Sequence, residues 1–240
     1  MKPVLILQHQ VPETAAYLLT WLKTQGVEYE VINAGAGEPF PGSITPYAAL
    51  AVMGGGMSAN DDLASNRQAE QLIVQAMILD IPVIGHCLGA QLMTRALKGQ
   101  VTVAATPEIG WQPIEYADHE LAQAWFGPNP TDTVIHWHYD TFSIPLGATL
   151  LASNANCVNQ AWGFGKHLAM QFHIEIDEPK IDLWVREDDD KWAQARSLFE
   201  SAQSRQTILD RTAQHIASHK RTADHIYTHW LSTTEWAKKV

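Results

Sequence analysis

The stretch IPVIGHCLGAQLMTRALKG, residues 81–99, combines a strand, a sharp turn and a helix. Residues 81–84 are an apolar run typical of a buried strand, and residues 90–97 have helical spacing and end at Gly99. Gly85 and Gly89 flank Cys87 at two residues on either side. Small residues there let the strand and the helix pack closely, so the sequence predicts a strained turn that exposes the cysteine thiol.

The same alternation of strands and helices extends on both sides of this turn. Strands are predicted at residues 4–8, 29–32 and 48–53, and helices at 13–25 and 64–79. This order predicts an α/β fold with a twisted, largely parallel sheet and helices on both faces. The β-like runs 133–137, 149–152 and 167–172 are expected to complete the same sheet, with antiparallel additions at its edge.

The composition changes near Pro179. An acidic cluster at 187–190 precedes a stretch to about Trp230 that has almost no Gly or Pro and many helix formers. We therefore expect a catalytic domain over 1–178 and a helical C-terminal extension over 179–240. The extension is predicted to be accessory and to carry no catalytic residue.

Length and charge exclude several classes of function. The 240 residues carry 16 Lys and Arg against 26 Asp and Glu, a formal net charge of −10, which disfavours binding to nucleic acid through its phosphates. Two cysteines do not make a disulfide framework, and no apolar run is long enough to cross a membrane. The N-terminus lacks the features of a signal peptide, so a cytoplasmic protein is expected.

Cys87 is the strongest candidate for chemistry. The N-terminus of the helix behind it supplies a positive dipole that favours the thiolate, which is the nucleophilic form. A lone cysteine is more often a small buried apolar residue, but the flanking glycines and the strand-to-helix context favour a nucleophile.

His173 and Glu175 follow the predicted strand at 167–172. Residues i and i+2 of an extended segment project on the same side, so Glu175 is positioned to orient His173. With 11 histidines in the chain, such a pair means little by itself. Together with Cys87, it predicts a nucleophile, a general base and an orienting carboxylate.

The glycine cluster 54–56 follows another predicted strand. One of its backbone amides, with that of Leu88, is expected to form an oxyanion hole, although a flexible turn would have the same composition. The cluster lacks the Gly-Lys-Ser/Thr ending of a phosphate loop and the spacing of a dinucleotide fingerprint.

With these features, the sequence resembles the class I glutamine amidotransferase family, in its stand-alone, GMP-synthase-like branch. The matching pieces run in family order over residues 4 to about 178: Gly54-Gly55, Gly85-His-Cys-Leu-Gly-Ala-Gln91, His136-Trp-His-Tyr-Asp140 and Gln171-Phe-His-Ile-Glu175. The resemblance implies a flavodoxin-like sheet and a catalytic triad of Cys87, His173 and Glu175.

The resemblance also implies roles for residues around the triad. Gly55 and Leu88 would supply the oxyanion amides, and Gln91, Trp137 and His138 match places where the family holds the amino and carboxylate groups of glutamine. Where the family usually has proline between the histidine and the glutamate, this chain has isoleucine at position 174.

The expected reaction is hydrolysis of the glutamine side-chain amide through a γ-glutamyl thioester on Cys87, which releases glutamate and ammonia. The acceptor of ammonia is unknown, and a separate synthetase chain is the expected partner. A γ-glutamyl hydrolase acting on a small conjugate would use the same triad. A catalytically silent binding protein on the same fold is the third alternative, which the retained triad disfavours.

No cofactor and no metal are expected. The pairs His215 with His219 and His225 with His229 have i, i+4 spacing, but solvated helix faces explain them better than a metal site. Cys157, among polar residues, is expected to be structural.

Overall fold

The computed structural model describes residues 2–187 and 189–238, so Asp188 of the acidic cluster lies outside the described residues. Eight strands form one sheet, in the spatial order β2-β1-β3-β4-β10-β9-β8-β6. They are β1 (Val4–Gln8), β2 (Tyr29–Asn33), β3 (Ala49–Val52), β4 (Val83–His86), β6 (Glu115–Tyr116), β8 (Thr149–Ser153), β9 (Ala161–Phe164) and β10 (His167–Met170).

The sheet is parallel on one side and antiparallel on the other. Pairing is parallel from β2 through β1, β3 and β4 to β10, and antiparallel from β10 through β9 and β8 to β6. The expected largely parallel sheet with antiparallel edge additions is confirmed.

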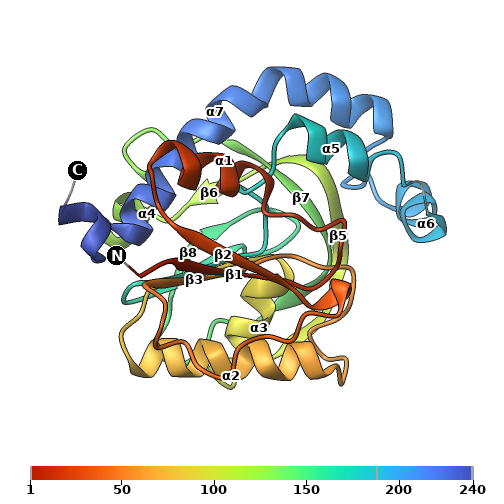
Figure 1. The fold of residues 1–240 in the computed structure, drawn as a ribbon. Helices are drawn as coiled ribbons and strands as arrows, with labels where there is room; N and C mark the ends of the chain where they lie inside the picture. The colour runs from red at the N-terminus through yellow and green to blue at the C-terminus, as the bar shows by residue number, and fades with distance from the viewer. Residues whose placement is uncertain (1, 188, 239–240) are drawn as a thin grey trace.

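Helices cover both faces of this sheet (Figure 1). The covering helices on one face are α1 (Ala16–Thr24), α4 (Glu120–Phe126), α5 (Glu178–Trp184) and α7 (Arg205–Leu231), and on the other α2 (Ala64–Ile78) and α3 (Leu88–Ala96). Alternate residues of β1 enter the two cores: Val4 and Ile6 pack in the core with α1, whereas Leu5 and Leu7 pack in the core with α2. This is why residues 4–7 of the strand are all apolar.

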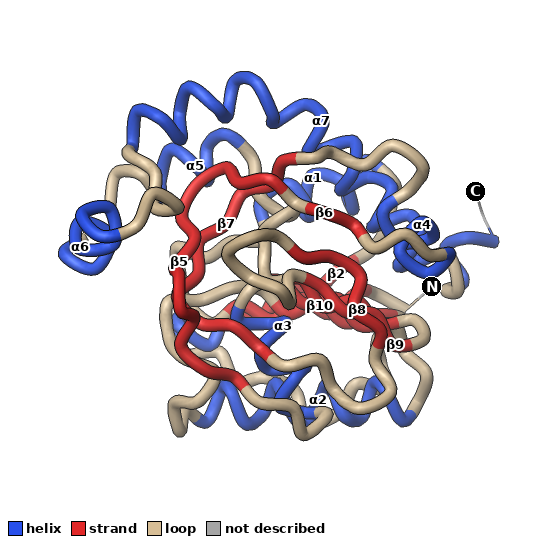
Figure 2. The backbone as a smooth tube through the Cα atoms, turned by 180° about the vertical axis from the view of Figure 1, so that it is seen from behind, coloured by secondary structure: helices blue, strands red, loops and turns tan. Residues whose placement is uncertain are grey.

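One part of the predicted sheet is placed differently. Residues 133–137 belong to β7 (Thr133–Phe142), which pairs with β5 (Val101–Pro113) in a separate antiparallel ribbon. An isolated bridge also joins Ile135 of β7 to His173. Figure 2 shows this ribbon along the side of the molecule that carries α6 (Asp190–Leu198). An apolar run predicts a strand but does not select the partner of the strand, so the expectation that this run joins the main sheet was wrong.

The C-terminal extension is mainly helical, as expected, with α5, α6 and α7. Helix α7 packs closely on the remainder of the chain. Its residues Ile226, Tyr227 and Trp230 belong to the same apolar core as Leu18 and Trp21 of α1. A short 3₁₀ helix follows at Glu235–Lys238, and another lies at Ala34–Ala36. Among the described helices, none combines the length and apolarity of a membrane span.

Candidate active site

Cys87 lies between the last residue of β4 and the first of α3. Its backbone has φ +49° and ψ −107°, in the positive-φ region that residues other than glycine rarely adopt. The Cys87 N–H donates to the carbonyl of Met170 in β10, 2.8 Å away, so the neighbouring strand holds the turn in place. The sharp strand-to-helix turn expected from residues 85–89 is present, and the Cys87 side chain in it is buried.

Gly89 lets α3 pack directly on the sheet. A Cβ atom at this position would lie 2.0 Å from the carbonyl oxygen of Val52 in β3, which is backbone and cannot move aside. At Gly85, a Cβ atom would lie 2.7 Å from the backbone of Gly89. The glycines of the motif are therefore required by contact between the strand and the helix.

His173 and Glu175 form a close pair. His173 Nδ1 lies 2.6 Å from Glu175 Oε1, and both side chains are buried. Ile174 packs in the apolar core that lies under α1. The His173–Glu175 pair therefore forms without the proline that the family usually has at this position. His173 Nδ1 is taken by Glu175, which leaves Nε2 for the cavity that His173 lines together with Cys87.

Charge attraction sets the ionisation of this pair. Burial by itself raises the pKa of Glu175, but His173 outweighs it and lowers that pKa to about 2. Burial by itself lowers the pKa of His173, but Glu175 and Cys87 outweigh it and raise that pKa to about 10. The arrangement favours a charged imidazole beside a carboxylate, and this positive charge stabilises a thiolate.

The glycine cluster 54–56 lies against the turn. A Cβ atom at Gly55 would come within 2.8 Å of Leu88 Cδ2, and one at Gly54 would lie 3.7 Å from Cys87 Cβ. Leu88 is the first residue of α3, where backbone N–H groups have no partner within the helix. The two predicted oxyanion residues, Gly55 and Leu88, are thus neighbours beside Cys87.

The three predicted substrate contacts lie around the thiol in different ways. Gln91 lines the cavity, and its Nε2 donates to Gln171 Oε1 at 3.3 Å, while Gln171 Nε2 lies 3.6 Å from Cys87 Sγ. The carbonyl oxygen of Trp137 lies 3.7 Å from the same sulfur. Both ring nitrogens of His138 contact other protein groups, so only its backbone remains for a substrate.

A cavity of about 520 Å³ contains the thiol and is partly walled by the C-terminal extension. Its lining includes four residues beyond 179: Trp184, Glu187, Asp189 and Lys191. The Trp184 ring lies 4.8 Å from that of His173 and 5.5 Å from that of Trp137. The extension, expected to be accessory, therefore contributes side chains to the walls of the site. Its concentration of tryptophans was the available signal.

The two histidine pairs of α7 do not converge on a common point. His219 is buried with its ring 5.1 Å from that of Trp111, and His215 also packs on Trp111. His225 Nε2 contacts the Ala124 carbonyl, and His229 packs on Trp125. Of the described residues, one group has the geometry to hold a metal: Glu108, His136 and His138.

Cys157 differs from Cys87 in its surroundings. It is buried outside the cavity, with its sulfur 3.3 Å from Thr141 Oγ1, and burial raises the pKa of its thiol. A thiol held in its neutral form is a poor nucleophile.

Sequence comparisons agree with this geometry. A family model described as glutamine amidotransferase class-I matches residues 18–181, more than half of the chain. This chain belongs to the class I glutamine amidotransferase family. A putative glutamine amidotransferase-like protein, YfeJ, from Salmonella typhimurium is 30% identical over 78% of this amidotransferase and 82% of that protein. A glutamine-hydrolysing GMP synthase from Bacillus pumilus is 32% identical over 67% of this chain, but the match spans only 32% of the synthase.

Solved structures share the fold over nearly the full length. A glutamine amidotransferase from Methylobacillus flagellatus is 33% identical, with a TM-score of 0.93 over 98% of this chain and 96% of that one. One from Thermotoga maritima is 22% identical, with a TM-score of 0.85, and shows likeness of fold alone. The similarity extends past residue 178, so the C-terminal helices are part of a fold found elsewhere.

Proposed function

We propose that this amidotransferase hydrolyses the side-chain amide of glutamine with Cys87 as nucleophile, His173 as general acid and base, and Glu175 as the orienting carboxylate. The observation that carries the proposal is the strained Cys87 turn in one cavity with the 2.6 Å pair of His173 and Glu175. Family membership adds to it, but the roles of these residues rest on the geometry.

The reaction would proceed in two stages. The Cys87 thiolate attacks the amide carbon, and the oxygen that gains negative charge is stabilised by the amides of Gly55 and Leu88. His173 then donates a proton to the leaving nitrogen, ammonia departs, and a γ-glutamyl thioester remains on Cys87. In the second stage, His173 takes a proton from water, which attacks the thioester and releases glutamate and the thiolate.

A separate synthetase chain is the proposed user of the ammonia, and the cytoplasm is the proposed location. The support is indirect: the name of the Bacillus pumilus relative couples glutamine hydrolysis to GMP synthesis. A second function, hydrolysis of a γ-glutamyl conjugate, is supported by the cavity. Its volume of about 520 Å³ leaves room for an amine larger than ammonia beside the γ-glutamyl group.

Replacement of the proposed nucleophile tests the chemistry directly. Cys87→Ala should lower glutamate release from glutamine by about 1,000-fold or more, because no other described thiol lines the cavity. Cys157→Ala is the matched control and should retain activity. A chloroketone analogue of glutamine should alkylate Cys87, as located by peptide mass spectrometry. Near-normal turnover of Cys87→Ala, or labelling of Cys157 instead, would overturn the assignment.

Assays on a substrate panel distinguish the two functions. Glutamate release is measured from glutamine and from γ-glutamyl amides, each with and without candidate synthetases. An amidotransferase should turn over glutamine slowly by itself and faster with its partner, because closure of the site depends on that partner. Rapid, partner-independent cleavage of a γ-glutamyl amide, with glutamine inert, would favour the hydrolase.

A further inference from the structure

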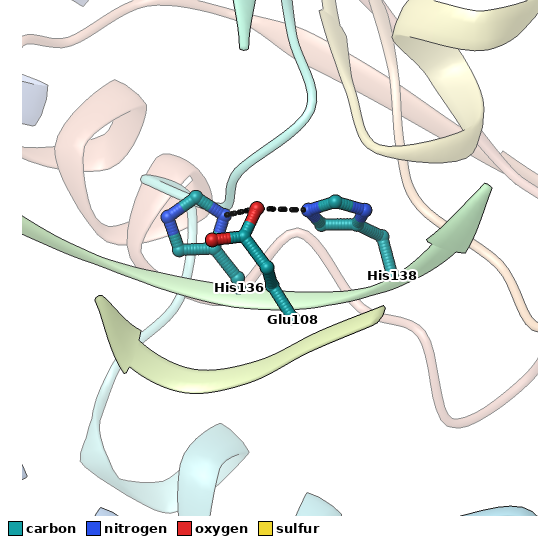
Figure 3. Close-up of side chains that lie close together, drawn as sticks. All are labelled: Glu108, His136 and His138. Carbon is teal, nitrogen blue, oxygen red and sulfur yellow. Dashed lines mark hydrogen bonds and ion pairs between the residues drawn. The ribbon is translucent and has the colours of Figure 1, made fainter. Parts of the chain in front are cut away.

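Glu108 is a fully buried carboxylate beside the active site that the proposed reaction does not use. Four side-chain N–H donors converge on it. His138 Nε2 lies 3.1 Å and Gln160 Nε2 2.6 Å from Oε2, while Asn154 Nδ2 lies 2.7 Å and Asn156 Nδ2 3.4 Å from Oε1. Figure 3 shows Glu108 between His136 and His138. So many donors stabilise the ionised carboxylate.

His138 is held at both ends of its ring. Its Nδ1 lies 3.0 Å from the carbonyl oxygen of Asp140, and its Nε2 faces Glu108. The two ring nitrogens of His138 thus each face an oxygen of the protein. Glu108 and His138 therefore form a buried hydrogen-bonded pair across the β5–β7 ribbon.

A metal ion explains the cluster less well than this pair does. The candidate ligand atoms of Glu108, His136 and His138 lie within 4.8 Å of one another. However, Oε2, the oxygen nearest both rings, already accepts from Gln160 and His138, and the Asn154 amide occupies Oε1. The carboxylate thus has its partners within the protein.

The pair lies where the backbone pairing of the ribbon is interrupted. Val103 pairs with Asp140, and the next pair is Glu108 with His138. Four residues of β5, 104–107, therefore face the single residue Tyr139 of β7. With the ladder broken there, a side-chain contact must fix the two strands relative to each other.

This interrupted stretch is the one that faces the substrate cavity. Residues 137–140 of β7 all line the cavity, and the Trp137 carbonyl lies 3.7 Å from Cys87 Sγ. Glu108 does not line the cavity, and among the described residues that hydrogen-bond to it, His138 alone does. Loss of its charge would loosen residues 137–140 while leaving Cys87, His173 and Glu175 in place.

We propose that Glu108 is a positioning residue, which through His138 fixes residues 137–140 of β7 so that the cavity can bind a γ-glutamyl group beside Cys87. The proposal rests on the proposed function. It assigns Glu108 to substrate binding and leaves the reactivity of the thiol to the triad.

Two reagents for Cys87 separate binding from reactivity. Iodoacetamide needs only the thiolate, whereas the chloroketone analogue of glutamine also needs the substrate cavity. Glu108→Gln keeps the size of the side chain and removes its charge. We expect it to slow alkylation by the analogue and to raise KM for glutamine by about tenfold or more, as displaced binding groups do, with the iodoacetamide rate unchanged. Glu115→Gln, at an exposed carboxylate of β6, is the control and should match the wild type in every assay.

The outcomes are distinct. Wild-type rates of Glu108→Gln with both reagents, or equal slowing with both, would overturn a positioning role. If the wild type reacts with iodoacetamide but neither hydrolyses glutamine nor reacts with the analogue, the proposed function itself fails. Stoichiometric metal in the purified protein would replace the hydrogen-bonded pair of Glu108 and His138 with a metal centre.

A second variant serves if Glu108→Gln does not fold. Asn154→Ala removes the 2.7 Å donor to Oε1 and leaves Glu108 and His138 themselves unchanged. It also removes the side-chain acceptor of the Asn156 and Cys157 N–H groups, so its fold is checked first. We expect the same effects as for Glu108→Gln, but smaller. Reaction with the analogue should be slower and KM for glutamine higher, with the iodoacetamide rate unchanged. An Asn154→Ala protein that folds and behaves as wild type in all three measurements would count against the proposal.

Discussion

His173 and Glu175 have unequal parts in the proposed reaction, because one moves a proton and the other holds the ring that does so. His173→Ala should lower kcat for glutamine hydrolysis by about 100- to 10,000-fold, the range for loss of a general acid or base. Glu175→Gln should cost less, about 10- to 100-fold, because an amide can still accept a hydrogen bond from Nδ1. Steady-state kinetics on variants with wild-type far-UV circular dichroism provide the measurement. Equal activity in all three proteins would contradict the proposed relay.

The sequence predicted those individual residues whose signals lie within a few positions of one another along the chain. The turn at Cys87 was predicted from its flanking glycines, and the contact between His173 and Glu175 from two-residue spacing in an extended segment. Glu108 was not found, because its partners are 30 to 52 positions away and meet only in the fold. The one local signal was an acidic residue directly before the apolar run Ile109 to Trp111.

At the scale of elements, the junction between β4 and α3 depends on Gly89. Gly89→Ala should destabilise the protein by at least about 3 kcal/mol, because the new methyl group meets the Val52 carbonyl and the helix must shift. Gly42→Ala is the control, since a Cβ there meets nothing within 4 Å. Urea unfolding followed by circular dichroism measures the difference. Equal stability of the two variants would show that α3 does not need this close contact.

Elements with a clear hydrophobic period were predicted well, and those defined by their partners were not. The predicted helix at 64–79 is α2 (Ala64–Ile78), and the predicted strand at 4–8 is β1. The β5–β7 ribbon was missed as a separate unit because pairing between distant segments leaves no local pattern. The irregular register opposite Tyr139 makes β5 harder still to predict.

For the whole molecule, two buried carboxylates make the free energy of unfolding depend on pH. Burial raises the pKa of Glu108, but neighbouring histidines and Asn154 outweigh it and lower that pKa to about 2, as His173 does for Glu175. A lowered pKa means that the folded protein favours the ionised form of each carboxylate, which stabilises the fold at neutral pH. Because the folded-state pKa is lowered, this stability is present above about pH 4.5 and is lost as the pH falls toward 2.

Urea unfolding at a series of pH values tests this linkage. The wild-type free energy of unfolding should fall between about pH 4.5 and 2, and that of Glu108→Gln should fall less steeply. If the free energy of unfolding falls equally with pH in the two proteins, Glu108 does not contribute to the acid dependence of stability. The raised pKa of His173 acts in the opposite direction: its contribution is complete below about pH 6.5 and is lost as the pH rises toward 10.

The helical extension shows how much of the whole molecule was predictable. Its composition predicted helices, and α5, α6 and α7 are present. That α7 shares a core with α1, and that Trp184 contacts His173, follows from tertiary packing that composition does not encode.

The wall formed by the extension has a consequence for how the site can change. The match to the family model ends at residue 181, whereas Trp184, Glu187, Asp189 and Lys191 all lie after it. The proposed nucleophile and part of the cavity wall are thus encoded in separate stretches of the gene. Mutations after residue 181 can alter which molecules the cavity admits without changing Cys87.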